Sequence, residues 1–166
     1  MKNNWFFIIL FMFLSIFLQF SLCYKIKLFL GIYPDIPLLY IILLGFYLTP
    51  SIFNIIIAFL SGLLIDSLSI ALIGPSAISF IFIIILNQNL SKFILKKTYF
   101  FQIGLLFICT FIGKNIVFWL SLLANNVPIF QAYINDILPT SLINSFLGLI
   151  LIPLFTFLFQ IKEKSF

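Results

Sequence analysis

The sequence predicts an all-α integral membrane protein, with about six transmembrane helices in one domain that covers residues 1–166. Hydrophobic residues make up 64% of the chain, charged residues only 8%, and mean hydropathy is +1.30. An ordinary soluble domain carries about 25% charged residues. Nine basic and four acidic side chains are too few to cover a globular surface. This balance excludes a soluble enzyme, a disordered tail and a nucleic-acid binder.

The first three helices are expected at residues 5–24, 36–48 and 51–65. The first is an apolar run of about the 20 residues that a membrane span needs, and it lacks the cleavage site of a signal peptide. Thr49 and Pro50 separate the next two, with Thr49 suited to an N-cap and Pro50 to the first helical position. Both helices are short, so whether they span fully or re-enter stays open.

Three further helices are expected at residues 75–90, 99–124 and 138–161. Gly74 and Pro75 mark the start of the first of them, because this pair interrupts helices. A basic loop with Lys92, Lys96 and Lys97 follows it.

Lysine counting gives the orientation. With the N-terminus inside, the inner segments carry Lys2, the three lysines of the basic loop, Lys162 and Lys164, whereas the outer segments carry only Lys25 and Lys27. Because cytoplasmic loops are enriched in lysine, both termini are expected in the cytoplasm of a multi-pass protein. The basic segments also suit anionic lipid headgroups.

The sequence contains no pattern typical of an active site. Histidine is absent, and there is no Gly-rich phosphate loop and no cysteine cluster. We therefore expect no enzyme activity, no cofactor and no metal. Asp35 and Asp136 lie in outer connections and are expected to be solvated.

Lys114 and Asp66 are the two charges expected within the membrane. An ionisable side chain at mid-helix tends to face protein or water because lipid does not solvate it. Each lies 15 residues after the start of a helix that begins inside, about 22 Å along its axis. The matching depth suggests an ion pair between them. The alternative is that Lys114 extends outward to the interface and Asp66 lies among headgroups.

Small residues recur every fourth position in the third helix, at Asn54, Ala58, Gly62 and Asp66. Such spacing lets helices approach closely. Two interpretations stay open. The stripe packs inside the bundle, or it receives a transmembrane helix from another protein.

The order of motifs from residue 33 to 90 resembles the rod shape-determining protein family MreD. Pro34 and Asp35 precede a Leu-rich helix, Ala58 and Gly62 lead to Asp66, and Gly74 follows. The family shows a Pro-Asp or Pro-Asn step, a Gly-to-Asp helical segment and a Leu-Gly turn. Here that turn is spread to Leu72-Ile73-Gly74.

This resemblance implies a non-enzymatic component of the bacterial elongation machinery in the inner membrane. It implies a role in positioning or regulating lateral peptidoglycan synthesis. The implied partners are the membrane protein MreC through its transmembrane helix, the actin-like MreB filament, and RodA with its penicillin-binding transpeptidase. The implied fold is similar to the substrate-binding subunits of energy-coupling-factor transporters. The alternative function is therefore a vitamin-binding subunit of a membrane transporter.

Overall fold

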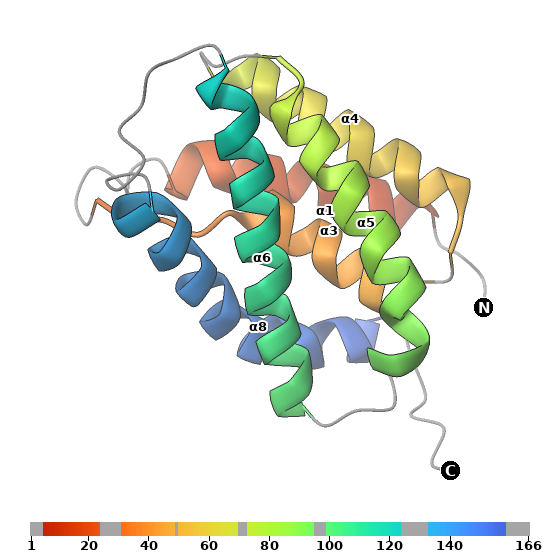
Figure 1. The fold of residues 1–166 in the computed structure, drawn as a ribbon. Coiled ribbons are helices and arrows are strands. Elements are labelled where there is room, and N and C mark those ends of the chain that lie inside the picture. Colours follow the sequence, from red (N-terminus) through yellow and green to blue (C-terminus); the bar gives the residue numbers. More distant parts are fainter. Residues whose placement is uncertain are drawn as a thin grey trace.

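The structure is a computed structural model that describes residues 5–23, 31–48, 50–69, 73–94, 99–123 and 133–158. In these ranges the chain is all-α (Figure 1). The elements are α1 (Trp5–Leu18), the π-helical turn η1 (Gln19–Cys23), α3 (Ile36–Tyr47), α4 (Ile52–Leu68), α5 (Pro75–Ile94), α6 (Tyr99–Leu122), the π-helical turn η2 (Tyr133–Ile137) and α8 (Leu138–Leu158).

The prediction of six helices is confirmed in the described part of the chain, but some helix ends differ. The N-cap of α4 is Ser51, not Thr49: the Ser51 hydroxyl accepts the N–H of Phe53 at 3.2 Å. The helix also continues to Leu68, past the expected end at residue 65. Its last turn is closed by Ser69, whose N–H donates to the carbonyl of Ile65 at 2.8 Å.

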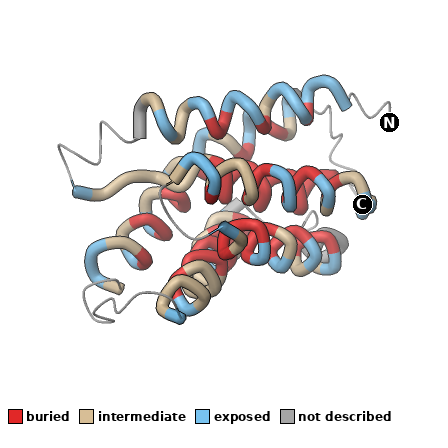
Figure 2. The backbone as a smooth tube through the Cα atoms, turned by 90° about the horizontal axis from the view of Figure 1, so that it is seen from above, coloured by how far each residue is buried: buried red, intermediate tan, exposed pale blue. Residues whose placement is uncertain are grey.

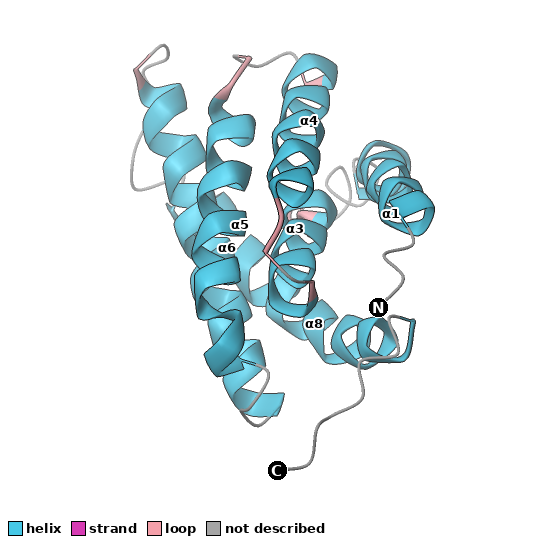
Figure 3. Ribbon diagram, turned by 90° about the vertical axis from the view of Figure 1, so that its right-hand side faces the viewer, coloured by secondary structure: helices cyan, strands magenta, loops and turns pink. Residues whose placement is uncertain are grey.

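The centre of the bundle is α3. Nearly every residue of this helix is buried, and it contacts α1, α4, α5, α6 and α8 (Figure 3). The sequence of α3 is apolar all round, which is typical of a helix enclosed by others. Figure 2 shows the buried stretches gathered along the inner helices. The bundle is therefore organised around this short helix.

The exposed faces are apolar and the interior contains polar groups. Phe17 of α1 and Phe157 of α8 are 67% and 81% exposed, while Asn87, Thr110 and Asn144 are fully buried. The core itself is mainly apolar, but so many large exposed apolar side chains are unusual for a soluble domain. Two helical stretches, Phe100–Leu122 and Tyr133–Phe157, are long and apolar enough to cross a membrane.

Helices α4 and α5 meet at Gly62. A Cβ atom added at Gly62 would lie 2.4 Å from the backbone Cα of Ala77, so only glycine permits this approach. Asn54, Ala58 and Asp66, the other members of the stripe, are also buried. The stripe is thus an internal packing surface between α4 and α5, and it is not open to a helix from another protein.

Gly148 of α8 has a similar role. A Cβ atom there would lie 2.8 Å from the Leu106 side chain of α6. Close helix contact through small residues therefore recurs in the bundle, as in many membrane helix pairs.

Replacing Gly62 with alanine should destabilise the protein by about 1–3 kcal/mol, because the new methyl group meets backbone that cannot move aside. The measurement is the thermal midpoint of the purified protein in detergent. Gly104→Ala in α6 is the matched control, since a Cβ at Gly104 has no neighbour within 4 Å. Equal midpoints for the two variants would contradict the assigned role of Gly62.

Candidate functional site

One end of the bundle encloses a cavity of about 700 Å³. Helices α4 and α6 and the turn η1 end there, and α3, α5 and α8 begin there. The polar groups that line it include Gln19, Tyr33, Asp35, Asp66, Lys114 and Asp136. The cavity therefore gathers polar side chains from segments that are far apart in the sequence.

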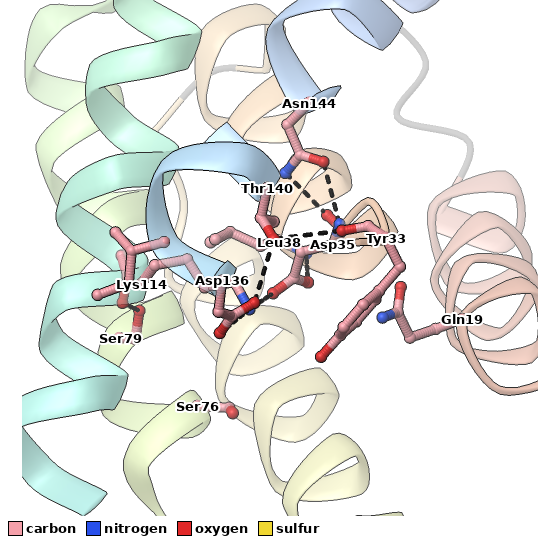
Figure 4. Close-up of polar contacts among 12 residues, drawn as sticks. Gln19, Tyr33, Asp35, Leu38, Ser76, Ser79, Lys114, Asp136, Thr140 and Asn144 are labelled. Carbon is pink, nitrogen blue, oxygen red and sulfur yellow. Dashed lines mark hydrogen bonds and ion pairs between the residues drawn. The ribbon is translucent and has the colours of Figure 1, made fainter. Parts of the chain in front are cut away.

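Lys114 lies between two carboxylates at this end. Its Nζ atom is 3.4 Å from Asp35 Oδ2 and 3.5 Å from Asp136 Oδ2. The Lys114 and Asp35 side chains are only 10% and 18% exposed, whereas that of Asp136 is 47% exposed. The ring centre of Tyr33 lies 5.7 Å from the same Nζ atom. Figure 4 shows Lys114 reaching from α6 toward the two aspartates.

Asp35 is held in place by α3 and α8. Its carboxylate accepts the N–H of Leu38 at 3.2 Å and so caps α3. Its own N–H donates to Asn144 Oδ1 at 3.0 Å, and its carbonyl accepts from Asn144 Nδ2 at 3.2 Å. A proline on each side, Pro34 and Pro37, restricts the backbone at this step. The carbonyl of Asp35 also accepts the N–H of Leu39 at 3.0 Å, so Asp35 has four hydrogen bonds besides its ion pair.

Asp136 is oriented from within its own helical segment. Thr140, one turn later, is 3.2 Å from both Asp136 Oδ1 and the carbonyl of Tyr33. Nearby, the side-chain oxygen of Gln19 accepts the N–H of Ile36 at 3.0 Å. These hydrogen bonds join η1, the start of α3, and the η2–α8 segment into one polar cluster around Lys114 (Figure 4).

Asp66 has a different role from the one expected. Its Oδ2 atom accepts the N–H of Gly74 at 2.8 Å and that of Ser76 at 3.1 Å. A carboxylate in this position stabilises the N-terminus of α5. Gly74 has a φ of +122°, a conformation that favours glycine. Asp66 and Gly74 thus form the turn that returns the chain from α4 to α5.

The expected ion pair between Asp66 and Lys114 is not formed. Both side chains line the cavity, but Lys114 is paired with Asp35 and Asp136, and Asp66 with backbone amides. The physical reason is the order of the helices: α5 packs against both α4 and α6. The expectation that Asp35 and Asp136 are simply solvated was also wrong, because they are the counter-charges of Lys114.

The remaining predicted residues are distributed over the fold. Pro34 lies beside the cluster and Ala58 is fully buried in α4. Lys92 belongs to α5 by its backbone, but its side chain lies outside the described residues, as do Lys96 and Lys97. The expected end of this helix at residue 90 was wrong, because α5 continues to Ile94 and Lys92 lies in its last turn. The cytoplasmic role of these lysines stays a prediction.

The cluster is suited to ionic and hydrogen-bond recognition. Among the described residues, no group of three or more histidine, cysteine or acidic side chains is arranged to hold a metal ion. Comparisons with protein-family models, curated proteins and solved structures find no match to this chain. The functional assignment therefore depends on the residues of this chain and on their geometry.

Double-mutant cycles should distinguish Asp35, the observed partner of Lys114, from Asp66, the partner expected from the sequence. Lys114→Met alone should cost about 1–3 kcal/mol of stability, because it leaves the partly buried carboxylate of Asp35 without its counter-charge, whereas the half-exposed Asp136 is screened by solvent. Combined with Asp35→Asn, it should show a coupling energy of about 1–3 kcal/mol. The free energy of unfolding in detergent is the quantity measured.

The matched control is the cycle of Lys114→Met with Asp66→Asn. Its coupling energy should stay below about 0.5 kcal/mol, since these side chains have separate partners. A larger coupling to Asp66 than to Asp35 would overturn the assigned ion pairs.

Proposed function

We propose that this protein is a non-enzymatic, multi-pass scaffold of the bacterial inner membrane, similar to MreD. In this role it helps to maintain rod shape by positioning or regulating lateral peptidoglycan synthesis. Its partners are MreC, MreB and RodA with its penicillin-binding transpeptidase. The observation that carries the proposal is that Asp35, Gly62, Asp66 and Gly74, which carry the resemblance, all have internal structural roles.

A membrane location is supported by the exposed surface. Large apolar side chains cover the outward faces of α1 and α8, and two helical stretches have the length and hydropathy of membrane spans. In the lysine-derived orientation, α4 and α6 end outside and α3, α5 and α8 begin there. The cavity then opens toward the outer side of the membrane.

Because the four residues that carry the resemblance have internal roles, partners would bind at other surfaces of the protein. The Gly62 stripe faces α5, so a transmembrane helix of MreC would contact one of the exposed apolar faces. The basic loop, with Lys92, Lys96 and Lys97, would face lipid headgroups or MreB on the cytoplasmic side. This arrangement separates the partner-binding faces from the polar cluster.

The cavity favours a second candidate function, a vitamin-binding subunit of a membrane transporter. Solute sites are concave and carry a few converging polar groups. Nine polar side chains line this cavity, more than the sequence alone placed together. The candidate is weaker because vitamin binding is suggested only by an implied similarity of fold, and a fold does not determine a function.

Thiol labelling should test the membrane orientation. With Cys23 and Cys109 replaced by serine, Ile134→Cys at the cavity end should react with a membrane-impermeant maleimide in intact cells. Phe100→Cys, at the opposite end of α6, should react only after permeabilisation. Both parent side chains are exposed, Ile134 at 49% and Phe100 at 86%, so neither thiol is hidden within the fold. The reverse labelling pattern would invert the topology.

Depletion in the native bacterium should distinguish the two functions. Loss of a scaffold should convert rods to round cells, and MreC should co-purify with the protein from native membranes. Cells that stay rod-shaped but require an added vitamin would contradict the scaffold and support the transporter subunit.

A further inference from the structure

The cavity has no role in the scaffold function, yet it has the size of a ligand site. Small-molecule sites are typically clefts of about 300–1,000 Å³, and this one measures about 700 Å³. Its walls come from every helix end at this side of the bundle. A cavity of this size and polarity needs its own explanation.

The charge of the lining favours a cation. Among the described residues, three carboxylates, from Asp35, Asp66 and Asp136, face the cavity together with one ammonium group, that of Lys114. The ammonium is already held by two of these carboxylates. An incoming anion would therefore meet excess negative charge, whereas a cation would reduce it.

The backbone N–H groups that an anion would need already donate hydrogen bonds within the protein. Helix N-termini usually attract anions through their free N–H groups. Here the N–H groups of Leu38, Gly74 and Ser76 donate to the side chains of Asp35 and Asp66. The N-termini of α3 and α5 are thus already supplied with carboxylates from the protein.

Acceptor capacity and aromatic surface complete the site. A carboxylate has about four acceptor positions. Asp136 accepts hydrogen bonds from Lys114 and Thr140 and is the most exposed of the ion-paired side chains. The lining also includes Phe20, Tyr33 and Phe80. Aromatic rings provide apolar contact and attract cations through their faces.

We infer that this cavity binds a small organic cation, a primary amine on an apolar body, with the ammonium at the half-exposed carboxylate of Asp136 and the apolar part against the aromatic side chains. The inference depends on the cavity and not on the scaffold function. Loss of rod shape on depletion and binding of an amine are therefore separate results, and either can fail alone.

Equilibrium binding to the full-length protein in detergent tests the inference with three probes of similar size. Phenethylamine is cationic, 2-phenylethanol is its neutral counterpart and phenylacetate is anionic. We expect saturable binding of phenethylamine, at least tenfold tighter than that of 2-phenylethanol, and no binding of phenylacetate. Equal binding of all three, preference for phenylacetate, or no binding of phenethylamine would overturn the proposal.

Two substitutions at Asp136 form the matched pair. Asp136→Asn should weaken phenethylamine binding about tenfold, and Asp136→Glu, which keeps the charge, should retain it. Gln19→Glu provides a test in the opposite direction if the asparagine variant does not fold. A glutamate oxygen can still accept the N–H of Ile36, and its added negative charge should tighten binding. Unchanged affinity of a folded Asp136→Asn variant, or of Gln19→Glu, would place the probe elsewhere and refute the site.

Discussion

The structure depends on how a single lysine is accommodated inside an apolar bundle. A charge removed from water is tolerated only when it is paired and hydrogen-bonded. Lys114 satisfies this condition through Asp35 and Asp136, at 3.4 and 3.5 Å. Those aspartates lie at the starts of α3 and of the η2–α8 segment, so the ion pairs bring three remote parts of the chain together. The hydrogen bonds between Asp35 and Asn144 also hold the start of α3 against α8. The central helix α3 is thus anchored to α6 and α8 at its N-cap residue, Asp35.

A second constraint acts between α4 and α5. Gly62 allows the two backbones to touch, and Asp66, one turn later, binds the amides that begin α5. Packing and capping therefore operate on the same helix pair, and they define the turn at Gly74. The two constraints meet at the cavity, since Asp66 and Lys114 both line it. The residues that stabilise the fold are consequently the residues that give the cavity its negative charge, which links the architecture to the proposed binding of an amine.

The helices were predictable from the sequence, and their contacts were not. Hydropathy and Gly-Pro punctuation locate the six helices, because both signals are local. The N-cap of α4 was misplaced since Thr49 and Ser51 are both competent capping residues. The partner of Lys114 was missed for a different reason: equal depth along two helices does not say which helices are neighbours, and α5 packs against both α4 and α6. The contact of Asp35 with Asn144 spans most of the chain and has no local signal. The capping role of Asp66 could have been predicted, because an aspartate shortly before a Gly-Pro helix start can accept the first N–H groups of that helix.

The assignment of Lys114 to Asp136 and Asp35 is the central claim, and charge reversal measures it most directly. Lys114→Asp places three carboxylates in the cluster and should abolish recovery of folded protein from the membrane. Adding Asp136→Lys restores one ammonium between two carboxylates, so folded protein, measured as a monodisperse peak on size exclusion, should return. Rescue by Asp66→Lys and not by Asp136→Lys would contradict the account and restore the pairing of Lys114 with Asp66.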